Sequence, residues 1–135
     1  FVFSYRLSDA LAELGRNEEA TKLLEKLLNN IPNVVVSNTG IIADIHASIA
    51  YRLARHLRDK DIHSAKKLLR NSVKLFEESG RACRDGVLAQ IELAEIVLDV
   101  EDNSDVIKLL SESLEQARKM GERDLSSRIE DMMRA

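Results

Sequence analysis

The feature that most constrains the fold of this chain is a short pattern that occurs three times. In each copy a small residue opens a leucine-rich amphipathic stretch. The small residues are Ala20, Ala65 and Val106, so the copies are separated by 45 and then 41 residues. Gly80 and Gly121 are also 41 residues apart, and each lies between two such stretches. Repeats of this length are typical of stacked helical pairs.

The composition favours helices over strands. The chain has 135 residues, with one proline, five glycines, no tryptophan and 4% aromatic residues, whereas the helix-forming Leu, Ala, Glu, Lys and Arg are plentiful. This length predicts a single domain over residues 1–135. We therefore expect an all-α fold.

Apolar periodicity and capping residues predict about seven antiparallel helices joined mostly by short connections. The expected ranges are 3–14, 17–30, 41–58, 62–79, a fifth helix that follows Gly80 and ends near Val100, 106–120 and 122–134. Gly15 and Gly80 are expected to end helices in the left-handed conformation, and Asp61 to cap the helix at 62–79. Valines at 34–36 form the only candidate strand. We expect an extended loop there, because a lone strand has no partner.

Charge and cysteine content exclude several classes of function. The net charge of −3 argues against a nucleic-acid partner, since such surfaces are usually basic. Cys83 is the single cysteine, which excludes an internal disulfide and fits a reducing compartment. The sequence contains no run of about 20 apolar residues and no signal segment. We expect a cytoplasmic protein with no membrane partner.

No arrangement of residues predicts catalysis or a cofactor. His46, His56 and His63 do not pair at the spacing that places two metal ligands on one helix face, and we expect the latter two to be solvated near helix ends. No glycine-rich phosphate loop is present. Cys83 lies beside arginines, but we interpret it as a partly buried residue at a helix start. The hypothesis is a chain that is not an enzyme and has no metal or cofactor.

The first copy of the pattern resembles a tetratricopeptide repeat. The positions that carry this resemblance are Leu7, Gly15, Ala20, Leu24, Leu27 and Pro32. The longer later units look like the extended repeats of kinesin light chains, bacterial signal-sensing regulators and repeat subunits of the anaphase-promoting complex. The resemblance implies a right-handed α-α superhelix with units at 1–36, 37–80 and 81–120 and a terminal helix at 122–134. An ordinary helical bundle is the alternative.

In this family the concave groove commonly binds a peptide or partner helix, so the resemblance implies a non-catalytic protein-interaction scaffold. The carboxylate-clamping positions do not match, and we predict no clamp. Candidate groove residues are Tyr5, Asp9, Glu13, Tyr51, Arg55, Arg58, Glu92, Glu95 and Asp99. We expect them outside the core. The alternatives are a sensory domain of a larger regulator that binds a small ligand or peptide, and an enzyme built on repeats.

Apolar residues near both ends of the chain suggest a further contact. They are Phe1 and Phe3 at one end and Met132 and Met133 at the other. Because the end units of a free solenoid need polar outer faces, such residues favour self-association or a chain that is one section of a longer scaffold. We therefore expect a homo-oligomer or contact with flanking repeats.

Overall fold

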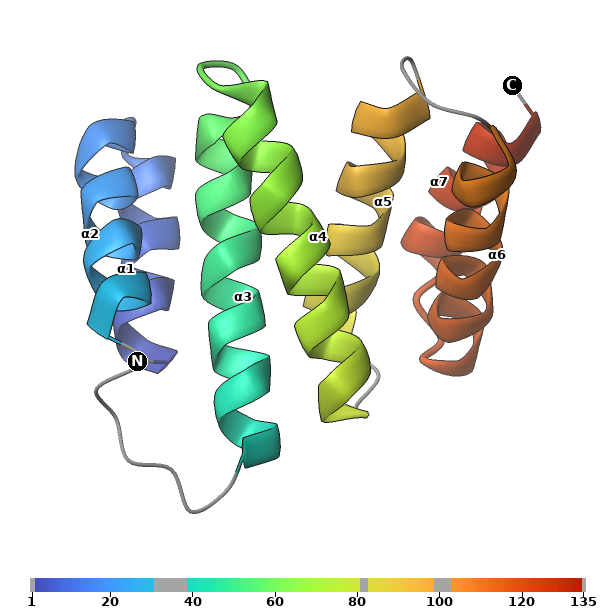
Figure 1. Ribbon diagram of the computed structural model, residues 1–135, viewed down its shortest axis with the longest axis horizontal. Helices are drawn as coiled ribbons and strands as arrows, with labels where there is room; N and C mark the ends of the chain where they lie inside the picture. The colour runs from blue at the N-terminus through green and yellow to red at the C-terminus, as the bar shows by residue number, and fades with distance from the viewer. Residues whose placement is uncertain (1, 31–38, 81–82, 99–102, 135) are drawn as a thin grey trace. The chain divides into compact units, whose positions relative to one another are not determined.

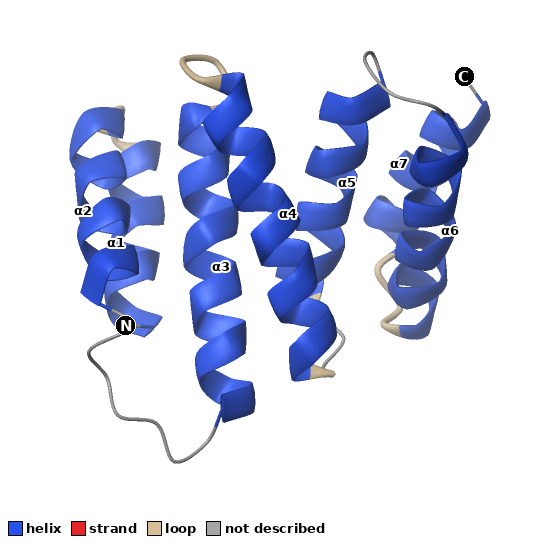
Figure 2. Cartoon of the chain, in the orientation of Figure 1, coloured by secondary structure: helices blue, strands red, loops and turns tan. Residues whose placement is uncertain are grey.

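A computed structural model describes the backbone of residues 2–30, 39–80, 83–98 and 103–134, and side chains over most of these ranges. Within these residues the fold is all-α, with seven helices and no strand (Figure 2). The helices are α1 (Val2–Glu13), α2 (Asn17–Asn30), α3 (Thr39–Leu57), α4 (Ile62–Ser79), α5 (Arg84–Leu98), α6 (Asn103–Lys119) and α7 (Arg123–Arg134). The predicted helices are confirmed to within a few residues at each end. The valines at 34–36 lie outside the described residues.

Glycines end three of the helices as left-handed residues. Gly15, Gly80 and Gly121 have φ of 78°, 70° and 71°, a region that residues with a Cβ atom rarely adopt. At the start of α4 the carboxylate of Asp61 accepts a hydrogen bond of 3.2 Å from the backbone N–H of Ser64. The predicted stops at Gly15 and Gly80 and the cap at Asp61 are confirmed.

Helices α1 to α4 form one compact unit, residues 1–80, in which successive helices are antiparallel and pack together (Figure 1). Its core joins α2 to α3 through Leu24, Leu27, Ile49 and Leu53. Between α3 and α4, the buried Ser72 hydroxyl donates a 2.8 Å hydrogen bond to the carbonyl of Ala47. This bond satisfies a buried polar group where the two backbones approach closely.

Helices α5 to α7 form a second compact unit, residues 81–135. Helix α5 is buried over most of its surface, with Val87, Ile91 and Ala94 fully covered. Helix α7 buries only Leu125 and Ile129. The described part of the chain contains no helix that is long and apolar enough to cross a bilayer.

The repeated pattern has one structural meaning in α2, α4 and α6. Its opening residues Ala20, Ala65 and Val106 are each the fourth residue of their helix and are at most 2% exposed. The leucine four positions later is also buried in all three helices, as Leu24, Leu69 and Leu110. The repeated pattern thus specifies which face of α2, α4 and α6 is buried.

Helix α1 leaves part of its apolar face exposed. Its apolar residues recur at helical spacing, but Leu7 is 54% and Leu14 73% exposed, whereas Ser8 is fully buried. Helical spacing places the two leucines on one side of α1 and Ser8 on another. A pattern of spacing shows that a helix is amphipathic, but not that a neighbour covers its apolar face.

Candidate functional site

The first unit contains a cleft of about 640 Å³. It lies where α1 ends, α2 begins and α3 ends, at the top of this unit in Figure 1. Its lining residues are Asp9, Ala12, Glu13, Asn17, Thr21, Arg52, Arg55, His56, Asp59 and Lys60. Many of these side chains are exposed, so the cleft is open to solvent.

An ion pair between α1 and α3 lies in this cleft. Arg52 Nε is 3.0 Å from each carboxylate oxygen of Asp9, and the Arg52 guanidinium also donates a 3.4 Å hydrogen bond to the carbonyl of Ser48. The side chain of Arg52 is only 13% exposed and that of Asp9 42%. This ion pair links α1 to α3. Because it is partly buried, water screens it less than an exposed pair.

Arg55 is held in a defined orientation beside this pair. Its guanidinium carbon lies 5.6 Å from the centroid of the Tyr51 ring, within cation–π distance. Because Tyr51 is only 3% exposed, the ring is a fixed support. Arg55 itself is exposed and faces the cleft with its remaining donors.

His56 adds a titratable group to the same wall. Burial lowers the pKa of His56, and the positive charge of neighbouring Arg55 lowers it further. The imidazole is therefore neutral at neutral pH. The charged lining then consists of three carboxylates and three cations, so the cleft is polar without a net charge.

The structure brings three of the predicted groove residues to this cleft: Asp9, Glu13 and Arg55. Tyr51 was expected outside the core, and this is wrong, because its ring is buried beneath Arg55. Arg58 is half-buried and does not line the cleft. The side chain of Tyr5 lies outside the described part of the chain.

The acids predicted for the groove in the range 81–120 are on α5 where they are described. Glu92 and Glu95 are half-buried there, and Glu95 accepts a hydrogen bond from Arg128 of α7. Glu95 thus contributes to the packing of its own unit. Asp99 lies outside the described residues.

The residues predicted for end-to-end association are only partly described. Met132 is half-buried and Met133 is 42% exposed, both on α7. The side chains of Phe1 and Phe3 lie outside the described residues.

Several lining residues were not predicted from the sequence, namely Arg52, His56, Asp59 and Lys60. A signal for two of them exists, because Arg52, Arg55 and His56 have the i, i+3 and i+4 spacing of one helix face. The partner of Arg52 is 43 residues away, and no local pattern identifies it.

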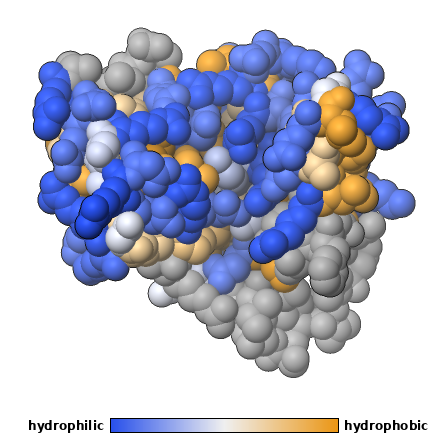
Figure 3. All heavy atoms as spheres, turned by 180° about the vertical axis from the view of Figure 1, so that it is seen from behind, coloured by the Kyte–Doolittle hydropathy of each residue, from blue (hydrophilic) through white to orange (hydrophobic). Residues whose placement is uncertain are grey.

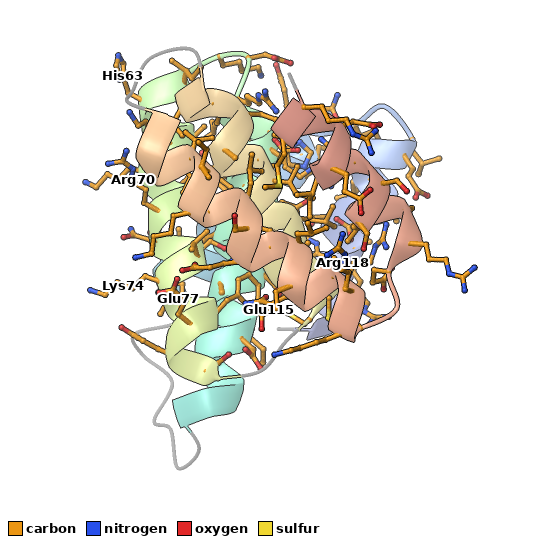
Figure 4. All side chains as sticks on the ribbon, turned by 90° about the vertical axis from the view of Figure 1, so that its right-hand side faces the viewer. His63, Arg70, Lys74, Glu77, Glu115 and Arg118 are labelled. Carbon is orange, nitrogen blue, oxygen red and sulfur yellow. The ribbon has the colours of Figure 1, made fainter. Side chains whose placement is uncertain are left out.

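The remaining histidines and the cysteine do not join a second site among the described residues. His63 is exposed on α4, where Figure 4 shows it projecting into solvent, as expected. His56 is half-buried, on the wall of the open cleft. Cys83 is partly buried just before α5, which confirms its interpretation. In the described part of the chain, no group of three or more His, Cys, Asp or Glu could hold a metal ion.

Comparison with known proteins gives no relative for this chain. No protein-family model matches it, and neither a curated protein nor a solved structure is significantly similar. The function must therefore be argued from the cleft and its chemistry.

Proposed function

We propose that this chain is a tetratricopeptide-like scaffold, in which the helix pairs α1–α2, α3–α4 and α5–α6 stack into a right-handed superhelix followed by α7. The shared position of Ala20, Ala65 and Val106 in their helices supports this arrangement. So does the contact of α2 with α3, which is the contact between successive pairs that a solenoid requires.

The proposed function is non-catalytic binding of a peptide or partner helix. The cleft at the end of the first unit is the observation that carries it. Its volume of about 640 Å³ is within the range of sites that take small ligands or a few side chains. Its rim consists of exposed side chains, which suits a chain segment better than an enclosed small molecule.

The residues that line the cleft indicate which kind of peptide segment would bind there. Among the described residues, Lys60, Glu13 and Asp59 have no ion-pair partner, and Arg55 contacts only the Tyr51 ring. A bound segment with charges of both signs satisfies these groups without leaving an unpaired charge in the interface. Arg55 is the expected anchor, since an arginine stacked on a buried tyrosine loses little side-chain freedom on binding.

The cleft chemistry supports binding over catalysis. The carboxylate of Asp9 is held by Arg52, and so is occupied as an acceptor. Asp9 is close enough to His56 to raise its pKa, but no hydrogen bond from His56 to a carboxylate is present among the described residues that would orient the imidazole as a general base. A sensory role with a small ligand would require an enclosed pocket, and this cleft is open.

The test is selection of peptides from a displayed random library on the full chain, followed by measurement of their dissociation constants by fluorescence anisotropy. We expect the double substitution Arg55→Glu and Lys60→Glu to weaken binding by about tenfold or more, as loss of an interface anchor does. We also expect binding to weaken as salt concentration rises.

The matched control is Lys67→Glu with Lys74→Glu, which makes the same change of charge on exposed positions of α4. Figure 4 shows Lys74 projecting away from the fold. Binding within about twofold of wild type is expected for this control. The proposal fails if the library yields no binder, or if both double variants weaken binding equally.

A further inference from the structure

Helix α1 carries an apolar face that no described residue covers. Leu7 and Leu14 are more than half exposed, and Ala10 beside them is exposed as well. Figure 3 shows an apolar patch over α1, with hydrophilic side chains on both sides of it. Ser8 is fully buried and Asp9 reaches α3. Helical spacing places both of them away from Leu7 and Leu14, so the leucine face is open to solvent.

The spacing of this face is that of a helix-pairing seam. Leu7, Ala10 and Leu14 are separated by three and then four residues, as at the a and d positions of a coiled coil. The N–H of Leu14 still bonds to the carbonyl of Ala10, at 3.1 Å, so Leu14 keeps the helical position. The small side chain of Ala10, midway along the seam, lets a second helix approach closely.

Two opposite charges flank the seam on one side. Arg6 and Glu13 are seven residues apart and both precede a seam leucine, which places them at successive g positions. Both side chains are exposed, and neither has an ion-pair partner among the described residues.

These charges select the orientation of a partner. When two copies of α1 pair antiparallel about Ala10, the g positions of one face those of the other, so Arg6 of each copy meets Glu13 of its partner. In a parallel pair each g residue faces the partner's e residue five positions later, so Arg6 faces the uncharged Leu11 and the position facing Glu13 lies beyond the end of α1. The face is therefore complementary to itself in the antiparallel orientation.

We propose that α1 is a homodimer contact, in which the Leu7, Ala10 and Leu14 seam of one copy packs antiparallel on the same seam of a second copy. The contact is isologous, with two Arg6–Glu13 pairs related by a twofold axis. Because a seam of this length buries little area, the dimer is weak and forms at high protein concentration. The Leu7, Ala10 and Leu14 seam lies outside the cleft, whereas Glu13 borders both the seam and the cleft.

The test is sedimentation equilibrium of the full chain from about 1 µM to about 1 mM, a range that covers weak interfaces. A monomer–dimer equilibrium is expected for wild type. Arg6→Glu alone and Glu13→Arg alone each turn two attractive pairs into two repulsive ones, which weakens association by roughly tenfold. The double substitution re-forms both pairs in reversed order and returns the dissociation constant to within about threefold of wild type.

Controls separate this contact from general effects of charge. Lys22→Glu and Glu25→Arg reverse charges at exposed positions of α2 and are expected to leave association unchanged. Leu14→Glu is expected to abolish it, with the helix content of each variant checked by circular dichroism. A chain that stays monomeric to 1 mM overturns the proposal, as does a dimer that ignores the single reversals or is not restored by the double one.

Discussion

The α1–α2 and α6–α7 hairpins have the same backbone turn and different outer surfaces. In the first, Gly15 N–H bonds to Ala12 O and Arg16 N–H to Leu11 O, at 3.0 and 2.9 Å. In the second, Gly121 and Glu122 make the corresponding bonds to Arg118 and Ala117, at 3.1 and 3.0 Å. Both turns are thus Schellman motifs built on one left-handed glycine.

The outer surfaces are opposite in character. The exposed side of α1 carries Leu7 and Leu14. Helix α7 instead carries ion pairs, in which Asp124 contacts Arg84 at 2.8 Å and Glu130 contacts Arg118 at 2.9 Å. The same turn geometry therefore occurs beside helices with different exposed surfaces, with two exposed leucines on α1 and ion pairs on α7.

The largest expected difference in the free energy of unfolding is between truncation of a core side chain and truncation of an exposed leucine. Leu24→Ala in α2 and Ile129→Ala in α7 remove fully buried side chains. Each should lower the free energy of unfolding by about 2–5 kcal/mol. Leu14→Ala should change it by less than about 0.5 kcal/mol in the monomer, because Leu14 is 73% exposed.

Urea unfolding followed by circular dichroism, at a concentration below association, measures these effects. Hydrogen exchange assigns each loss to its own unit. If Leu14→Ala lowered the free energy of unfolding as much as Leu24→Ala, the result would show that the leucine face of α1 is covered in the monomer.

Substitution of the two turn glycines should have equal, intermediate effects. An added Cβ atom at Gly15 or Gly121 meets no atom within 4 Å, so the cost is conformational alone. We expect Gly15→Ala and Gly121→Ala each to destabilise by about 1–2 kcal/mol. Asparagine at either position should cost less, since it tolerates the left-handed region better. Thermal unfolding measures both stabilities. If Gly15→Ala and Gly121→Ala differ widely in stability, the two turns are not equivalent.

The smallest expected effect concerns the charged side of α7. The hydrogen bond from Arg84 is the main cause that lowers the pKa of Asp124, and Arg84→Met should raise that pKa toward its ordinary value. Because the folded pKa is the lower one, the pair stabilises the fold above the unfolded-state pKa, and this contribution is lost as pH falls through the folded pKa.

Carboxyl-carbon NMR titration of Asp124 measures this shift. Arg123→Met is the matched control, since it removes an exposed arginine of the same turn that makes no ion pair among the described residues. An Asp124 titration that is the same with and without Arg84 would show that the pair does not form in solution.

Prediction from the sequence succeeded where the signals are local. The bounds of α4 were predicted to the residue, because Asp61 and Gly80 are adjacent to it and act on its own backbone. The cleft was predicted only in part. Asp9, Glu13 and Arg55 were identified, but the pairing of Asp9 with Arg52 depends on how α1 and α3 pack, which no local pattern encodes.

The sequence by itself determined the helices, their glycine stops and the buried face of α2, α4 and α6, because each depends on residues within a few positions along the chain. Only the tertiary structure decided which apolar or aromatic side chains are covered. Tyr51 and Leu14 show this, since a tyrosine expected in the groove is buried and a leucine that follows the apolar spacing of its helix is exposed. Burial is a property of neighbouring helices, and helix packing is decided by contacts between residues far apart in sequence.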